Sequence, residues 1–227
     1  MPATINLASL GSAGITIFGA NAGDRSGYSV SGAGDVNGDG FDDLIVGAYD
    51  GDGPSNNRSS AGNSYVILGG ALLPATIDLA TLGTGGMIIF GGDMDDNSGR
   101  SVSRAGDVNG DGYDDLLIGA ALADAFSNNK SNAGESYVVF GGPSLPAIID
   151  LASLGSAGII IRGAEANDHC GMSVSRAGDV NGDGFDDILI GANLADAFGN
   201  AKSGAGESYV VFGSASPLTT IDRNARQ

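Results

Sequence analysis

The sequence predicts an all-β fold built from three copies of one small antiparallel sheet, and three features of the chain lead to this prediction. One segment recurs at Gly34, Gly106 and Gly178, so the repeat period is 72 residues. The apolar runs within each copy are short and β-like rather than helical. Glycine supplies 40 of the 227 residues, which suits a chain with many tight turns.

The repeat accounts for the whole chain. The copies occupy approximately residues 4–75, 76–147 and 148–219, and the last eight residues begin a fourth copy. Because no linker and no change of composition separates the copies, we expect a single domain over residues 1–227. A parallel β-helix would need a much shorter internal period, and three independent small domains would need linkers, so both alternatives are weaker.

Each copy carries the signals of four strands. In the first copy Tyr28–Ser31 alternates, Leu44–Val46 is a continuous apolar run typical of a strand buried on both faces, and Tyr65–Leu68 is a third candidate. The fourth candidate, Ile15–Phe18, recurs at Met87–Phe90 and Ile159–Ile161. Small four-stranded sheets that are apolar on both faces stack face to face, as the blades of a β-propeller do. The segment Leu79–Gly83 predicts one helical turn that ends at a glycine.

The charge of the chain restricts its partners. The net charge is −17, which argues against nucleic acid and anionic membranes and favours metal ions or a cationic partner. The single cysteine, Cys170, has no partner for an intramolecular disulfide. No run of 18 apolar residues predicts membrane insertion, and the start at Met1 lacks the pattern of a signal peptide.

The segment Asp35–Asp43, which reads DVNGDGFDD, carries the chemistry. Oxygen side chains stand at positions 1, 3, 5 and 9, while the glycine at position 6 permits a sharp turn and lets the carbonyl of position 7 face an ion. Such hard oxygen ligands suit Ca²⁺, whereas Mg²⁺ prefers stricter geometry and Zn²⁺ prefers His or Cys. Position 12 is apolar and both flanks read as strands, so the loop is not an EF-hand.

The same loop occurs three times, so we expect three Ca²⁺ ions per chain and no other cofactor. The predicted ligands are Asp35, Asn37, Asp39, the carbonyl of Phe41 and Asp43 in the first copy; Asp107, Asn109, Asp111, the carbonyl of Tyr113 and Asp115 in the second; and Asp179, Asn181, Asp183, the carbonyl of Phe185 and Asp187 in the third.

The simpler interpretation of one such loop is a polar hairpin turn, and three copies with the same oxygen positions argue against it. The loops hold 12 of the 27 acidic residues, and so many neighbouring carboxylates repel one another without a cation. The remaining aspartates of the loops, Asp42, Asp114 and Asp186, are expected to be exposed at the strand edge rather than to be ligands.

A GYSVS-like strand, the DxNxDGxxD loop, an LIVGA strand and a YVxFG-like strand together resemble the FG-GAP repeat, and the resemblance extends over the whole chain. It implies one four-stranded blade per repeat, with Ca²⁺ in the loop between the first two strands. It also implies adhesion or protein recognition rather than catalysis. The sequence departs from the family where the Phe-Gly pair reads Ser26-Gly27, Ser98-Gly99 and Cys170-Gly171.

Three blades are too few for a closed ring, since closed propellers have about four to eight. In the family the fourth strand precedes the next repeat, so Gly14–Gly19 is an orphan fourth strand and the third blade lacks one. We therefore expect a half ring that closes by oligomerisation, in which the N-terminal strand of one chain completes the last blade of another. This gives a six-bladed homodimer; nine blades from three chains, or a fragment of a larger propeller, are the alternatives.

Other candidate sites are weaker, and we predict no catalytic and no cofactor-binding residue. His169 has no partner that recurs, and Cys170 is expected to be a small half-buried thiol. The long loops 49–62, 121–134 and 193–206 lie opposite the aspartate-rich turns in a propeller. Their equivalent cations could hold an anionic ligand, although an ordinary solvated charge is the simpler interpretation; these cations are Arg58, Lys130 and Lys202.

The sequence therefore predicts a non-catalytic calcium-binding β-propeller for adhesion or for recognition of a protein or glycan ligand. The alternatives are a purely structural, self-assembling scaffold and an accessory module of a secreted enzyme. Weak calcium sites would be empty in the cytosol, so an extracellular or cell-surface setting is expected although the chain shows no signal peptide.

Overall fold

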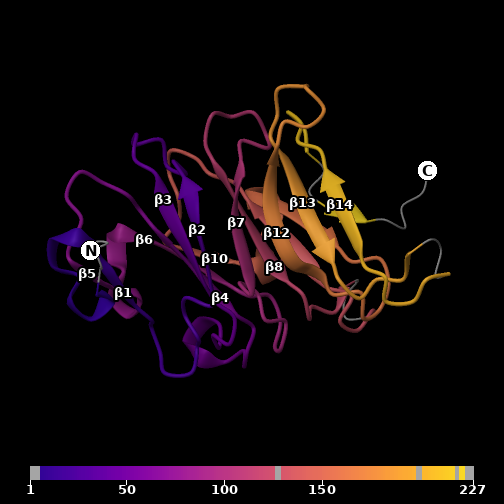
Figure 1. Cartoon of the computed structure of the whole chain (residues 1–227), viewed down its shortest axis with the longest axis horizontal. Coiled ribbons are helices and arrows are strands. Elements are labelled where there is room, and N and C mark those ends of the chain that lie inside the picture. The colour runs from indigo at the N-terminus through magenta and orange to yellow at the C-terminus, as the bar shows by residue number, and fades with distance from the viewer. Residues whose placement is uncertain (1–5, 126–128, 198–200, 218–219, 223–227) are drawn as a thin grey trace, which may run out of the picture.

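A computed structural model describes residues 6–125, 129–197, 201–217 and 220–222, and its strands form a row of sheets (Figure 1). The first complete sheet has the order β10-β6-β4-β3-β2. Its strands are β2 (Ser29–Gly34), β3 (Asp43–Ala48), β4 (Asn63–Ile67), β6 (Gly86–Phe90) and β10 (Ile148–Asp150).

The second sheet repeats this order as β15-β11-β9-β8-β7. Its strands are β7 (Ser101–Gly106), β8 (Asp115–Ala120), β9 (Glu135–Val139), β11 (Gly158–Arg162) and β15 (Thr220–Asp222). In both sheets the four strands that come first in the chain, β2, β3, β4 and β6 or β7, β8, β9 and β11, pair antiparallel, as the sequence predicted.

Two smaller sheets flank this pair at opposite ends of the row (Figure 1). At one end, β1 (Thr16–Phe18) pairs parallel with β5 (Thr76–Asp78). At the other end, β12 (Cys170–Gly178), β13 (Asp187–Ala192) and β14 (Glu207–Val211) form an antiparallel sheet in that order.

The complete sheets differ from the predicted four-stranded blade, because each gains a fifth strand that is parallel to the fourth. Strand β10 follows β9 and precedes β11, both in the second sheet, yet it pairs with β6 of the first sheet. The first strand of a copy, such as β10, therefore pairs with the outer edge of the preceding sheet instead of its own. Sequence periodicity contains no signal for this pairing, since it joins residues of different copies.

Short 3-10 helices follow the parallel strands β5 and β10. The helical turn predicted at Leu79–Gly83 appears as two 3-10 turns, Leu79–Thr81 and Gly83–Gly85. The Asp78 carboxylate accepts a hydrogen bond from Ala80 N at 2.9 Å and caps the first turn. The other described 3-10 helices are Leu7–Ser9, Gly11–Ala13, Pro54–Asn56, Leu151–Ser153 and Gly155–Ala157.

The hydrophobic core lies between adjacent sheets, which explains why their strands are apolar on both faces. Ile45 and Val66 of the first sheet pack with Leu116 and Ile118 of the second. Leu117 and Val138, on the opposite face of the second sheet, pack with Ile188 and Ile190 of the third. A central sheet is thus buried on both sides, as stacked propeller-like sheets require.

Adjacent sheets approach so closely at two points that glycine is required there. A Cβ atom on Gly119 of β8 would lie 2.0 Å from the carbonyl oxygen of Gly171, and one on Gly47 would lie 2.0 Å from that of Gly99. Both obstacles are backbone atoms, so relief would require the sheets to separate.

Gly119→Ala is therefore expected to lower the free energy of unfolding by about 1–3 kcal/mol, the usual cost of overpacking. Gly70→Ala is the matched control, because a Cβ there meets no atom within 4 Å. Urea denaturation of both variants measures the difference. Equal stabilities would contradict the close approach of the sheets.

Candidate metal centre

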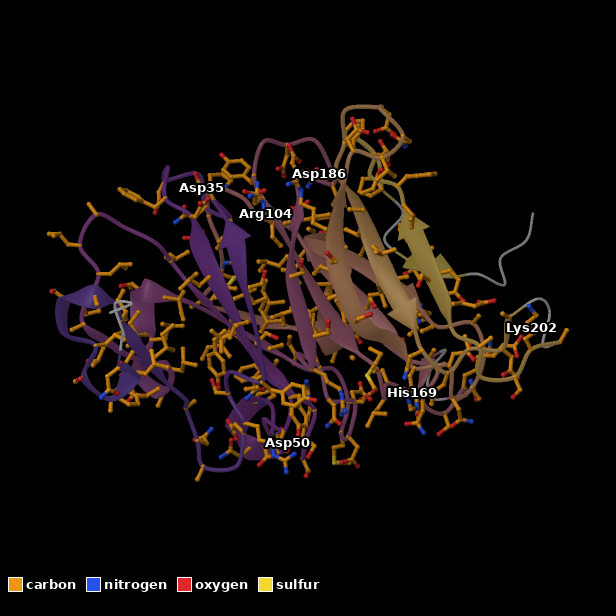
Figure 2. All side chains as sticks on the ribbon, viewed as in Figure 1. Asp35, Asp50, Arg104, His169, Asp186 and Lys202 are labelled. Carbon is orange, nitrogen blue, oxygen red and sulfur yellow. The ribbon has the colours of Figure 1, made fainter. Side chains whose placement is uncertain are left out.

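Three aspartate loops, residues 35–43, 107–115 and 179–187, join the first two strands of their sheets: β2 to β3, β7 to β8 and β12 to β13. Figure 2 places Asp35 and Asp186 along the upper side of the row of sheets, and Asp50, His169 and Lys202 along the lower side. The long loops thus lie opposite the aspartate loops, as expected of a propeller-like arrangement.

The first aspartate of each loop organises the turn. Oδ1 of Asp35 accepts hydrogen bonds from Gly38 N at 2.8 Å and from Asp39 N at 3.0 Å, and Oδ2 accepts one from Gly40 N at 2.9 Å. Gly38 and Gly40 have φ of 76° and 88°, a region that glycine enters without strain. Asp107 and Asp179 accept the same three bonds in their own loops.

The third and fifth positions bond to each other. Oδ1 of Asn37 accepts a hydrogen bond from Asp39 N at 2.9 Å, and its amide donates to Asp39 Oδ2 at 3.0 Å. The other Asp39 oxygen accepts from Phe41 N at 2.9 Å. The loop thus brings the side chains of positions 1, 3 and 5 to one turn of backbone, and their convergence on an ion stays a prediction.

The ninth position is a buried anchor. Asp43 is fully buried; its Oδ2 accepts from Val36 N at 2.9 Å and its Oδ1 from Gly69 N at 2.7 Å. It therefore ties both the start of the loop and the end of β4 to the start of β3. Burial, together with the negative charges of Asp39 and Asp35, raises its pKa.

The equivalent carboxylate in the middle loop is more strongly perturbed. Burial raises the pKa of Asp115 to about 7, and the charges of Asp111 and Asp107 act in the same direction. A cation near these carboxylates would oppose both effects, because it stabilises their ionised form.

The donor set of each loop fits Ca²⁺ by its chemistry: three carboxylates, one amide oxygen and a main-chain carbonyl, all of them hard oxygen ligands. Among the described residues, no group of three or more His, Cys, Asp or Glu side chains converges as a metal cluster. In the described geometry the loop carboxylates accept hydrogen bonds from backbone amides, so an ion would have to draw the oxygens of positions 1, 3 and 5 inward.

The prediction that Asp114 and Asp186 are exposed at the strand edge is wrong. Oδ2 of Asp114 accepts a hydrogen bond from Asp35 N of the preceding loop at 2.9 Å, and Arg104 pairs with Oδ1 at 2.7 Å. Asp186 makes the same contacts with Asp107 N and Arg176, at 3.0 and 2.6 Å. Figure 2 shows Arg104 on the same upper side of the molecule as Asp35 and Asp186. Each aspartate fastens its own sheet to the loop before it.

The seventh position joins the loops as well. The ring of Tyr113 lies over Gly38, where a Cβ atom would be 2.5 Å from its Cε1 atom, and Phe185 lies over Gly110 in the same way. The sequence assigned this position only a carbonyl ligand. The aromatic side chains were a usable signal, because they recur at the same place in all three copies.

Two of the three cations predicted in the long loops, Arg58 and Lys130, make bonds within the fold. Arg58 makes a bidentate pair with Asp150, at 2.7 Å for both bonds, and donates to Gly91 O at 2.8 Å. Lys130 donates to Ala164 O. Both side chains are therefore used within the fold, and Arg58 fastens the crossing strand β10.

Cys170 is buried rather than half-buried, and burial raises its pKa to about 12, so the thiol stays protonated and unreactive. Burial lowers the pKa of His169, and the nearby charge of Arg100 lowers it further. A neutral imidazole in a loop residue with φ of 58° is consistent with a structural position.

Sequence reasoning missed a buried acidic group between the first two complete sheets. Asp96 is buried beside Asp93, Asp124 and Glu135, in a polar cavity that Arg162 also lines. Burial raises its pKa to about 7, and the three neighbouring carboxylates add to this. Tyr137 donates a hydrogen bond to Glu135, which pairs with Arg162 at 3.0 Å.

Stability is expected to depend on pH through Asp96. Its pKa is about 7 in the folded chain and 3.8 as a reference, so the folded state holds the proton more tightly. Stability should fall as pH rises from about 4 to 7 and then level off. Asp96→Asn should reduce this slope, leaving the part that Asp115 contributes, and should raise stability at pH 8 by roughly 1–3 kcal/mol, because an amide still accepts the bond from Asp93 N.

Thermal unfolding between pH 4 and 8 measures this effect. Asp95→Asn is the control, since the neighbouring Asp95 is exposed and asparagine tolerates its φ of 65°. A slope of unchanged size in Asp96→Asn would exclude Asp96 as one of its sources.

Stacked propeller-like sheets with an aspartate loop between their first two strands define an all-β repeat protein. The FG-GAP repeat matches residues 26–67, 98–139 and 171–211, more than half of the chain. The chain belongs to the FG-GAP repeat family.

The curated relatives are integrin-like in most cases. The chain is 28% identical to integrin alpha-PS2 of Drosophila melanogaster over 216 residues, or 93% of this chain and 15% of that protein. It is 30% identical to integrin alpha-5 of Xenopus laevis over 73% of this chain and 14% of that protein. It is also 30% identical to a phosphatidylinositol-glycan-specific phospholipase D of Dictyostelium discoideum, over 81% of this chain and 19% of that protein. The chain thus spans less than a fifth of the length of these relatives.

Within the described part of the chain, no helix has the length and apolar character needed to cross a membrane.

Proposed function

We propose that this chain is a non-catalytic module for adhesion or ligand recognition whose sheets are held in register by Ca²⁺ in the three aspartate loops. The observation that carries the proposal is the identical construction of the loops. Each has the same oxygen ligands, and Asp35, Asp107 or Asp179 accepts the same hydrogen bonds from backbone amides of its turn. The integrin relatives support recognition as the general role.

The position of the loops gives calcium a mechanical role. Asp35 donates its backbone N–H to Asp114 of the next sheet, and Asp107 donates to Asp186. An ion that orders residues 35–43 would therefore also order the junction between two sheets. The ligand would then bind on the opposite side of the sheets, where the rigid sheets support the long loops. The setting would be extracellular or at the cell surface.

A second candidate is an accessory module of an enzyme, which the Dictyostelium phospholipase relative favours. That relative matches over only 19% of its own length, so its activity need not lie in the matched part. A purely structural scaffold remains the third candidate, and it would bind calcium without binding a ligand at the long loops.

Calorimetric titration with CaCl₂ tests the proposal. We expect three ions per chain with dissociation constants of about 10⁻⁴ to 10⁻³ M, and weaker binding of Mg²⁺. Asp39→Ala should remove one of the three ions. Asp42→Ala is the matched control, because it removes the same charge from the same loop at a position outside the donor set.

The result that would overturn the proposal is an unchanged titration in Asp39→Ala, or an equal loss in both variants. The first would leave the loops as hydrogen-bonded turns, and the second would indicate general attraction of cations to an acidic surface.

A further inference from the structure

The two small sheets are the missing parts of one complete sheet. A complete sheet consists of three inner strands and two outer strands, as in β7-β8-β9 followed by β11-β15. Among the described residues, the sheet β12-β13-β14 has only the three inner strands, and β1-β5 has only the two outer ones. These fragments lie at opposite ends of the chain (Figure 1), so they cannot complete each other within one molecule.

The repeat places the fragments in equivalent positions. Strand β1 lies two repeat lengths before residues 160–162 of β11, and β5 lies two repeat lengths before β15. Both pairs are parallel in the same register. Strand β14 has the sequence ESYVV, which is also that of β9. The outer edge of β14 is therefore chemically the same edge that β9 presents to β11.

The burial of these two identical strands differs. Every residue of β9 is buried, whereas none of β14 is. Val138 is fully buried, but Val210, the same residue of β14, is 46% exposed. Phe212 and Leu189 are also exposed, and an apolar cavity lined by Tyr209, Val211 and Ile221 among others lies beside β14. This end of the molecule is an apolar sheet face with a free strand edge.

The other end shows a matching apolar face. Val30 of β2 is 67% exposed, although the equivalent Val102 of β7 is only 8% exposed. Tyr28 and Leu44 beside it are exposed as well. The outer half of this face is covered by Ile17 and other residues of the β1-β5 segment, so only the inner half is left bare. Three inner strands of another sheet would fill that half.

The aspartate loops also show that one contact between sheets is missing at each end of the row. Tyr113 lies over Gly38 and Phe185 lies over Gly110, but no described atom lies within 4 Å of a Cβ placed on Gly182. Phe41, which occupies the same position as Tyr113 and Phe185, is exposed. One end thus offers the aromatic ring, and the other end offers the glycine that receives it.

We propose that a second copy of this chain donates β1 and β5 to β14, and that two chains close by reciprocal donation into one ring of six sheets. By equivalence with β11 and β9, the register pairs Gly14 with Val211, Ile15 with Val210, Thr16 with Tyr209, Ile17 with Ser208 and Phe18 with Glu207. A two-fold axis leaves no free edge, because each chain gives one strand pair and receives one. Phe41 of each chain would then lie over Gly182 of the other.

The new junction differs from the internal ones at one position. Arg104 and Arg176 pair with the clamping aspartates Asp114 and Asp186, but the equivalent residue in the first copy is Gly32, so Asp42 has no arginine. A Cβ on Gly32 meets no atom within 4 Å. Gly32→Arg should therefore supply the missing pair and lower the dimer dissociation constant by about three- to tenfold.

Light scattering in millimolar CaCl₂ gives the first test, with an expected mass of twice 22.4 kDa. Val210→Lys should yield a folded monomer, because Val210 is exposed in the single chain and a charge there obstructs only the contact between copies. A monomeric parent chain would overturn the proposal. A larger assembly would overturn the two-chain ring.

Cross-linking tests the register. In a Cys170→Ser background, which places in the third copy the residue found at Ser26 and Ser98, Ile15→Cys with Val210→Cys should form an intermolecular disulfide. Opposed residues of antiparallel strands have Cα atoms about 4.5–5.5 Å apart, within the range of a disulfide. Ile15→Cys with Val211→Cys is the control, since Val211 points to the other face. A dimer that cross-links equally in both pairs would overturn the strand exchange.

Discussion

Removing calcium from this protein is expected to lower its free energy of unfolding by about 4 kcal/mol. At ten times the dissociation constant each ion contributes roughly 1.4 kcal/mol, and the three aspartate loops are alike in donors and hydrogen bonds. A loss of this size is a large part of a typical stability of about 5–15 kcal/mol. For a chain of this length the melting temperature should fall by roughly 8–16 °C.

Differential scanning calorimetry in calcium and then in EDTA measures the change. A variant with Asp39→Ala, Asp111→Ala and Asp183→Ala should melt at the same temperature in both buffers. Asp42→Ala should retain nearly the full difference. Identical melting of the parent chain in calcium and in EDTA would contradict a stabilising role for the ion.

Asp115→Ala, like the equivalent changes at Asp43 and Asp187, is expected to be among the most damaging substitutions in the loops, at about 2–6 kcal/mol. The side chain is fully buried and accepts hydrogen bonds from Val108 N at 3.0 Å and Gly141 N at 2.9 Å. Alanine would leave two donors without an acceptor, and each unsatisfied buried group costs roughly 1–3 kcal/mol. The loss should appear even in EDTA, because these bonds do not involve the ion.

Comparison with Asp111→Ala separates ion binding by the loop from the buried hydrogen bonds of Asp115. Asp111 is exposed and bonds only within its own turn, so its loss should matter in calcium and have little effect in EDTA. Urea denaturation of both variants in each buffer measures the four values. Equal losses for Asp111→Ala and Asp115→Ala in EDTA would show that Asp115 is not the anchor.

Much of the candidate site could be predicted because it is local. The three aspartate loops are continuous segments, and their oxygen positions recur at a fixed period, so Asp35, Asn37, Asp39 and Asp43 were found without a structure. The hydrogen bonds place Asp35, Asn37 and Asp39 in one turn and tie Asp43 to the start of the loop. Whether the loops hold calcium stays a prediction.

The contacts between sheets could not be predicted in this way. Asp114 reaches Asp35 across 79 positions, and Arg58 reaches Asp150 across 92. Each aspartate looks like an ordinary polar residue in its own copy, and only its neighbour in space gives it a role. The misjudged exposure of Asp114 and Asp186 and the missed burial of Asp96 have this common cause.

The sequence by itself determined the repeat, the antiparallel strands and the composition of the loops, because periodicity and turn chemistry are properties of short segments. Only the tertiary structure decided how one copy holds the next: the parallel fifth strand, the clamping by Asp114, and the contrast between buried Val138 and exposed Val210 in identical strands. Burial depends on what lies across the sheet. The neighbouring sheet contains residues of another copy of the repeat, and the sequence of a strand does not show whether such a sheet covers it.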